Sequence, residues 1–155
     1  MTAISRYRKI YTRLWSNPEM RKLDLVDKLI AIYLLTTPQA NRLGFYRFSL
    51  ALAAEDMGLP IEILADRLPR VLTAFEWLHD PAAGVICIPS WFVWNPPENE
   101  NVLRGALRDL TEVPTTPLYE AFQASVELLP KPWQETFRHG LANVARRFRQ
   151  RSPNQ

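Results

Sequence analysis

The sequence contains little cysteine and little glycine. Its 155 residues include five glycines and one cysteine, Cys87, which excludes an internal disulfide. No glycines have the spacing of a phosphate-binding loop or a dinucleotide fingerprint. The two histidines, His79 and His139, lie far from each other and lack the spacing of metal ligands. We therefore expect no enzymatic activity, no cofactor, no metal and a reducing compartment.

Long apolar runs are also missing. The most apolar stretch, residues 29–35, is far shorter than the roughly 20 residues that cross a bilayer. The first residues lack the apolar run of a signal peptide, so we expect a cytoplasmic protein with no membrane partner. The hydrophobic content of 47% is enough for one buried core, which excludes a fibrous or disordered chain.

The formal net charge of +3 hides a segregation of charge along the chain. Residues 1–22 carry six basic and one acidic side chain, residues 23–100 carry five and ten, and residues 101–155 carry eight and five. Both ends are therefore basic and the middle is acidic. This layout suits an anionic partner at the ends and a basic partner in the middle.

The first part of the chain has the pattern of a winged helix-turn-helix. In order, the pattern predicts a helix at 24–36, a strand at 43–48, helices at 50–57 and 60–75, and a hairpin at 76–88 with its loop at 80–84. In a winged helix the third helix reads the DNA groove and the hairpin is the wing.

Individual residues mark the ends of these elements. Asp24 and Ser49 are the expected N-caps of the first two helices, and Gly58 ends the second because glycine enters the left-handed region at no steric cost. Pro69 lies inside the third helix and is expected to bend it or break it near Leu68.

The second part of the chain predicts helices that pack on this unit. Apolar residues recur at helical spacing in 102–111, in 116–130 and from 132 onward. The expected fold is mainly α with a small β-hairpin. Its divisions are a winged-helix domain with a basic N-terminal segment over residues 1–100, a helical C-terminal extension packed on it over 101–151, and a frayed tail over 152–155.

An aromatic block precedes the extension. Residues 89–99 predict a loop that two prolines stiffen, and it contains Trp91, Phe92 and Trp94. We expect these rings to form a satellite core that fixes the extension, with an exposed partner site as the alternative. Cys87, in an apolar strand, is expected to be a small buried hydrophobe.

Several segments of the chain resemble a known family. They are residues 7–18 (YRKIYTRLWSNP), 28–38 (KLIAIYLLTTP), 44–47 (GFYR), 54–58 (AEDMG), 88–91 (IPSW) and 95–99 (NPPEN). Together they resemble the winged-helix domain of phage replication-initiation or replisome-organiser-type proteins. The resemblance covers residues 6–125 and implies a phage or prophage protein that binds DNA at replication origins in the bacterial cytoplasm.

DNA contacts are expected from basic residues in several elements, with duplex favoured over single-stranded DNA. Arg67 and Arg70 of the third helix could contact the groove, and a role as solvated helix residues is an equal alternative. The other candidates are Arg6, Arg8, Lys9, Arg13, Arg47, Arg146, Arg147 and Arg149.

Three rings stand among the basic residues of the N-terminal segment. Tyr7, Tyr11 and Trp15 recur every four residues. This spacing favours the core stripe of a helix over a surface for stacking on nucleic-acid bases, although rings pointing inward and cations pointing outward are compatible.

The acidic middle of the chain supports a second class of function. Four residues of the second and third helices, Glu55, Asp56, Glu62 and Asp66, would repel phosphate and suit a basic partner. The alternative is a phage protein-binding module whose acidic winged-helix face engages or inhibits a host nucleic-acid-binding protein, in replication or defence. The amphipathic C-terminal helices leave a homodimer open.

Overall fold

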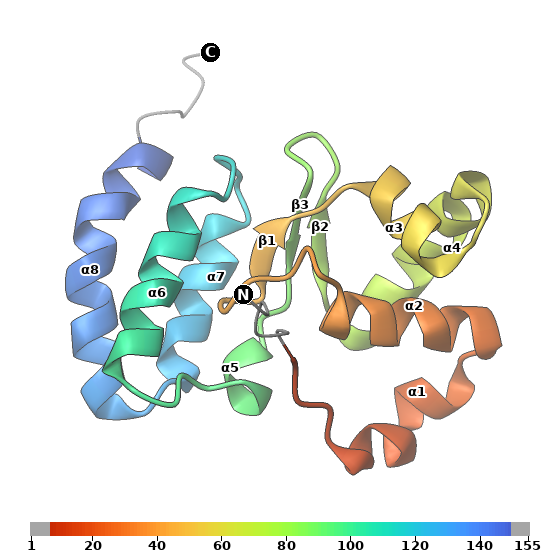
Figure 1. Ribbon diagram of the computed structural model, residues 1–155, viewed down its shortest axis with the longest axis horizontal. Helices are drawn as coiled ribbons and strands as arrows, with labels where there is room; N and C mark the ends of the chain where they lie inside the picture. Colours follow the sequence, from red (N-terminus) through yellow and green to blue (C-terminus); the bar gives the residue numbers. More distant parts are fainter. Residues whose placement is uncertain (1–6, 150–155) are drawn as a thin grey trace, which may run out of the picture.

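A computed structural model describes residues 7–149 (Figure 1). The first half contains the 3₁₀ helix η1 (Thr12–Ser16), α1 (Pro18–Lys22), α2 (Leu25–Thr36), β1 (Phe45–Arg47), α3 (Leu50–Met57), α4 (Ile61–Phe75), β2 (Leu78–Asp80) and β3 (Val85–Cys87). The second half contains α5 (Trp91–Trp94), α6 (Glu100–Thr111), α7 (Tyr119–Ser125), the 3₁₀ helix η2 (Val126–Leu128) and α8 (Lys131–Arg149). The protein is mainly helical, as expected.

Local capping sets the ends of the central helices. The Asp24 side chain accepts a hydrogen bond from the backbone N–H of Asp27 at the start of α2, and the Ser49 hydroxyl accepts one from Leu52 at the start of α3. Gly58 ends α3 in the left-handed conformation, with φ of 68°. These three predictions are confirmed, because caps depend on residues close in sequence.

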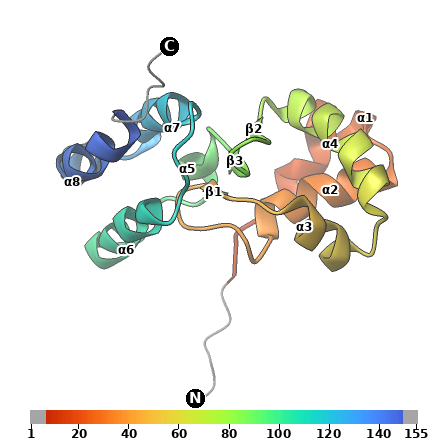
Figure 2. The same ribbon diagram turned by 90° about the horizontal axis from the view of Figure 1, so that it is seen from above.

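The three strands form one antiparallel sheet in the order β1-β3-β2. Cys87 of the central strand pairs with Phe45 of β1 on one side and with Leu78 of β2 on the other. The helices α2, α3 and α4 lie on one side of the sheet, and α6, α7 and α8 lie on the other (Figures 1 and 2).

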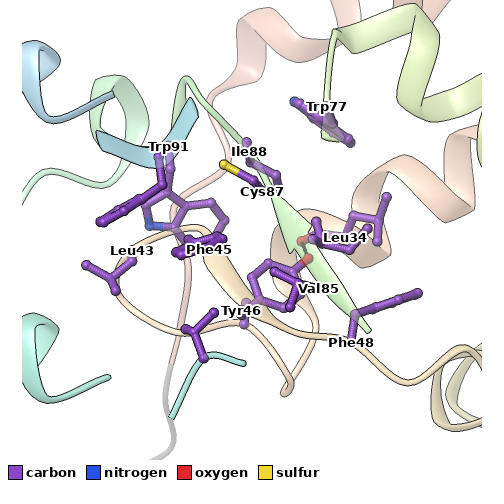
Figure 3. Packing of buried hydrophobic residues seen from close by; sticks show 14 of the residues in the cluster. Leu34, Leu43, Phe45, Tyr46, Phe48, Trp77, Val85, Cys87, Ile88 and Trp91 are labelled. Carbon is purple, nitrogen blue, oxygen red and sulfur yellow. Dashed lines mark hydrogen bonds between the residues drawn. The ribbon is translucent and has the colours of Figure 1, made fainter. Parts of the chain in front are cut away.

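The core is centred on β1 and β3. Figure 3 shows its side chains gathered around these strands. Tyr46 is 1% exposed, and its hydroxyl donates to the carbonyl of Leu34 in α2 over 2.8 Å. Phe45 stacks on Phe122 of α7, with ring centroids 4.8 Å apart. The sheet is thus joined to a helical group on each of its sides.

Polar contacts also hold the C-terminal helices in place. The Thr116 hydroxyl donates to the Asp80 carboxylate over 2.6 Å, which ties the segment before α7 to the hairpin. The backbone N–H of Arg42 donates to Asp109 of α6 over 3.1 Å. Hydrogen bonding to Thr116 lowers the pKa of Asp80. Within residues 7–149, no helix combines the length and the apolar character that a bilayer crossing needs.

Two local expectations are corrected. Of the two outcomes expected at Pro69, a bend or a break, the break is wrong, because α4 continues through it to Phe75. The proline faces solvent, while Leu68 and Leu72 beside it are buried, and burial of about 1.5–3 kcal/mol per large apolar side chain outweighs one lost hydrogen bond. Part of the predicted loop at 89–99 is helical, as α5.

Replacing Gly44 with alanine is expected to destabilise the protein more than replacing Gly58. Both have positive φ, where an added Cβ costs about 1–2 kcal/mol. At Gly58 that Cβ meets nothing, but at Gly44 it collides with the side chain of Trp91. We expect Gly44→Ala to lower the free energy of unfolding by about 1–3 kcal/mol more, measured by urea denaturation. Equal losses would contradict this packing.

Candidate nucleic-acid interface

The two arginines of α4 face α2. Arg67 lies 2.6 Å from a carboxylate oxygen of Asp24 and 3.2 Å from one of Asp27, and Arg70 lies 3.1 Å from the other Asp27 oxygen. The residue Asp27 is only 2% exposed. A buried carboxylate needs such partners, since an unpaired charge in the interior is costly. Both arginines therefore hold α4 against α2, and their contact with DNA remains a prediction.

These contacts also change how the groups titrate. Hydrogen bonds from the backbone of Asp27 and then from Arg67 lower the pKa of Asp24, which lies at the surface. The bond to Asp24 in turn raises the pKa of Arg67. Arg67 thus stays charged, with its guanidinium committed to two carboxylates.

The aromatic residues of the N-terminal segment are at the surface, and the predicted core stripe is wrong. Tyr7 is 73% exposed, Tyr11 44% and Trp15 56%. The backbone of Tyr11 is extended, and Trp15 lies in the short 3₁₀ helix η1 that follows it. Tertiary hydrogen bonds hold the segment in this form: Arg8 donates to the carbonyl of Ala40 and the backbone of Lys9 donates to the side chain of Asn95.

The N-terminal cations gather around the tryptophans of the segment that contains α5. The Arg13 guanidinium carbon lies 3.9 Å from the ring centroid of Trp94 and 5.6 Å from that of Tyr11. The guanidinium of Arg8 lies 5.7 Å from the ring of Trp91, and Lys9 Nζ lies 3.7 Å from Glu98. The structure thus brings together Arg8, Lys9 and Arg13, three of the predicted site residues. Arg6 lies outside the described residues.

A hollow of about 480 Å³ opens between the N-terminal segment, the ends of α2 and α4, and α5. We call it the aromatic groove. Five rings contribute to its lining: Tyr11, Phe75, Trp77, Trp91 and Trp94. Lys9 and Arg13 also line it. The size falls within the range of about 300–1,000 Å³ that is usual for ligand sites.

Most of the groove was not identified from the sequence as a site. Trp91 and Phe92 are buried, as predicted, but they belong to the main core and not to a satellite core, while Trp94 is only half-buried and Val93 is exposed. Phe75 and Trp77 also line the groove, and they stack with their ring centroids 4.7 Å apart. Both aromatic residues can be seen in the sequence, but nothing in their spacing predicts that they lie close to residues 9–17.

The remaining predicted cations are dispersed. Arg47 is exposed at the end of β1, beside an open hollow that includes residues of α3 and the hairpin loop. Arg146 is exposed on α8, whose C-terminal end lies at the opposite corner of the molecule from η1 (Figure 1). Arg147 and Arg149 belong to α8, but their side chains lie outside the described part.

The four acidic candidates are exposed on α3 and α4. Asp56 also accepts a hydrogen bond from the hydroxyl of Tyr33 over 2.7 Å, whereas Glu55, Glu62 and Asp66 face solvent. Ile61 and Ile63 stand beside Glu62, 40% and 43% exposed. Helical spacing places Ile63 next to Asp66 on the outer face of α4 and Ile61 on another side, so this face combines negative charge with one exposed apolar side chain.

Cys87 is 1% exposed in β3, which confirms the prediction of a buried hydrophobe. Burial raises the pKa of its thiol to about 12, so the reactive thiolate is scarce at neutral pH. Burial also lowers the pKa of His79. Over residues 7–149, no three histidine, cysteine or acidic side chains gather in a way that could hold a metal ion.

Comparison of the chain with protein-family models, curated proteins and solved structures finds no match. The interpretation of the surface therefore depends on its own chemistry.

Replacing Arg67 with alanine is expected to reduce stability more than replacing Arg70. The Arg67 side chain is 26% exposed and bonds two carboxylates, whereas Arg70 is 59% exposed and bonds one. Either replacement removes one partner of the buried Asp27 carboxylate, which costs up to about 1–3 kcal/mol. The loss should be larger for Arg67, which is mostly buried and also bonds Asp24, than for Arg70, whose exposed guanidinium water can replace.

Urea denaturation of both variants measures this difference. Unchanged stability in Arg67→Ala, together with a loss of DNA affinity, would contradict the structural role of Arg67 and support its contact with the groove of the DNA.

Proposed function

We propose that the chain is a DNA-binding protein of the winged-helix type, encoded by a phage or prophage, that acts in replication initiation or its control in the bacterial cytoplasm. The order α2, β1, α3, α4, β2, β3 supports the fold assignment, since it is the order expected for a winged helix. The resemblance to replication-initiation proteins supports the biological role.

The observation that carries the proposal is the set of cations and exposed rings on the N-terminal segment. Lys9 and Arg13 are at the surface, next to the exposed Tyr11 and Trp15. Within residues 7–149, Arg13 has no carboxylate partner, so its charge is available to a phosphate. Cations contacting the DNA backbone supply much of the affinity of DNA-binding proteins.

This proposal assigns the phosphate contacts differently from an ordinary winged helix. Arg67 and Arg70 already pair with Asp24 and Asp27, and the hairpin loop at 80–84 has no basic residue. The N-terminal segment is therefore the main contact. Arg47 is a further contact to the phosphate backbone of the DNA.

Neutralising two cations of the N-terminal segment is expected to weaken DNA binding and reduce its salt dependence. In the double variant Lys9→Ala/Arg13→Ala, the slope of log affinity against log salt for a duplex should become shallower by about 1.8, because two phosphate contacts are lost. Fluorescence anisotropy of a labelled duplex over a salt series measures this slope.

The matched control is Arg104→Ala/Arg108→Ala, which removes two exposed cations from α6 and the same net charge. The control should keep the wild-type slope. An equal change of slope in both variants would show that the binding depends on net charge alone. No binding by the wild-type protein at low salt would refute the proposal.

The outer face of α4 favours a second candidate function, that of a protein-binding module. Exposed Ile63 beside Glu62 and Asp66 suits a partner with apolar and basic groups. Such a partner is a host nucleic-acid-binding protein, whose own surface is basic. In this function the protein would engage or inhibit that partner.

The second candidate predicts that reversing the charge of α4 abolishes complex formation. The Glu62→Lys/Asp66→Lys variant should not bind a host nucleic-acid-binding protein that the wild-type chain binds, because the basic surface of that partner then meets positive charge on α4. Capture from host cytosol, identification by mass spectrometry and titration of the purified partner measure this. Glu120→Lys/Glu135→Lys, on exposed sites of α7 and α8, is the control and should bind as the wild type does.

A further inference from the structure

We infer that the aromatic groove takes up an unpaired nucleotide base, with the adjoining phosphates held by Lys9 and Arg13. The inference rests on the proposed DNA binding and names the kind of strand that the protein recognises. From the sequence we expect duplex DNA to be favoured over single-stranded DNA. The inference reverses this preference, since a groove of this kind selects single-stranded or opened DNA over an intact duplex.

The walls of the groove have the chemistry of a base site. Tyr11 and Trp94 line it with their ring centroids 5.0 Å apart, and Phe75 and Trp77 line it as a stacked pair. A base presents a flat π-face of the kind that stacks on aromatic side chains, whatever the sequence. In a duplex that face is covered by neighbouring base pairs, so only an unpaired base can enter.

Charge at the groove favours a nucleotide over an apolar protein side chain. Lys9 is half-exposed, at 53% of its side chain, and the guanidinium of Arg13 is held over the ring of Trp94. A cation already placed on an aromatic ring loses little conformational freedom when it binds a phosphate. Glu98, the partner of Lys9, is 62% exposed in its side chain, so a phosphate can replace it in water.

The groove also offers hydrogen-bond donors for a base edge. The side-chain oxygen of Asn17 accepts from the backbone of Glu19, and that of Asn95 accepts from the backbone of Lys9. These bonds fix both side chains and leave their NH₂ groups with no acceptor among the described residues. Base edges carry oxygen and nitrogen acceptors that such groups can bind.

Exposed rings extend this surface beyond the groove. Trp15 is 56% exposed, and Arg21 donates to its backbone carbonyl over 3.3 Å. A large apolar side chain in water beside cations is the arrangement that single-strand-binding surfaces use to stack successive bases. Trp15 is therefore the expected platform for the next base along the strand.

The test compares the full chain with its Tyr11→Ala variant on a labelled oligothymidylate and on a labelled duplex of the same length. Tyr11 is 44% exposed on extended backbone, so its removal should leave the fold intact, which circular dichroism checks. We expect the affinity for the single strand to fall by about 5- to 150-fold, as for the loss of one stacked base. The affinity for the duplex should fall far less, because the variant keeps Lys9 and Arg13, the proposed phosphate contacts.

Two variants serve as controls. Tyr11→Phe keeps the ring and should bind the single strand as the wild type does. Leu128→Ala removes a comparably exposed apolar side chain from η2, and it should change neither affinity. As an independent readout, oligothymidylate should quench tryptophan emission in the wild type, and less so in Trp94→Phe, because a stacked base quenches the indole beside it.

The outcomes separate this inference from the proposed function. Duplex binding without single-strand binding would overturn the inference and leave the proposed function intact. No change in Tyr11→Ala, or an equal loss on both nucleic acids, would also overturn it. Failure of the wild-type chain to bind either nucleic acid at low salt would overturn both the inference and the proposed function. An apolar side chain of a protein partner would then be the expected occupant of the groove.

Discussion

The packing of Trp91 against Gly44 is the contact on which the arrangement of the molecule depends. Glycine is required there, since a Cβ would collide with the indole. Trp91 is 1% exposed, lines the aromatic groove and lies below the guanidinium of Arg8. One buried side chain therefore connects the start of β1, the N-terminal segment and α5. Overpacking at this point would disturb the core and the groove together.

The buried carboxylate of Asp27 decides where positive charge is available. Its two arginine partners hold α4 on α2, and this pairing uses the cations that a groove-reading helix would offer. The outer face of α4 is left with Glu62 and Asp66. The proposed nucleic-acid binding therefore relies on the N-terminal segment, where Arg13 is held by rings instead of by carboxylates. The same fold can serve either partner class, because function resides in the surface chemistry.

Much of the central fold could be predicted from short-range signals. The bounds of α3 follow from Ser49 and Gly58, and those of α2 follow from Asp24 and its apolar spacing. The site could not be predicted in the same way. The four-residue spacing of Tyr7, Tyr11 and Trp15 is that of a helix, but bonds from residues 8 and 9 to distant parts of the chain hold the segment extended.

The sequence by itself determined the mainly helical composition, the capped helices, the hairpin and the segregation of charge, because each depends on neighbours along the chain. Only the tertiary structure decided that Arg67 faces carboxylates and that Phe75 and Trp77 share a groove with Tyr11. These outcomes depend on which residues meet across long separations in sequence. Periodicity identifies a buried face, but it does not identify the partner that buries it or the side chains that remain in water.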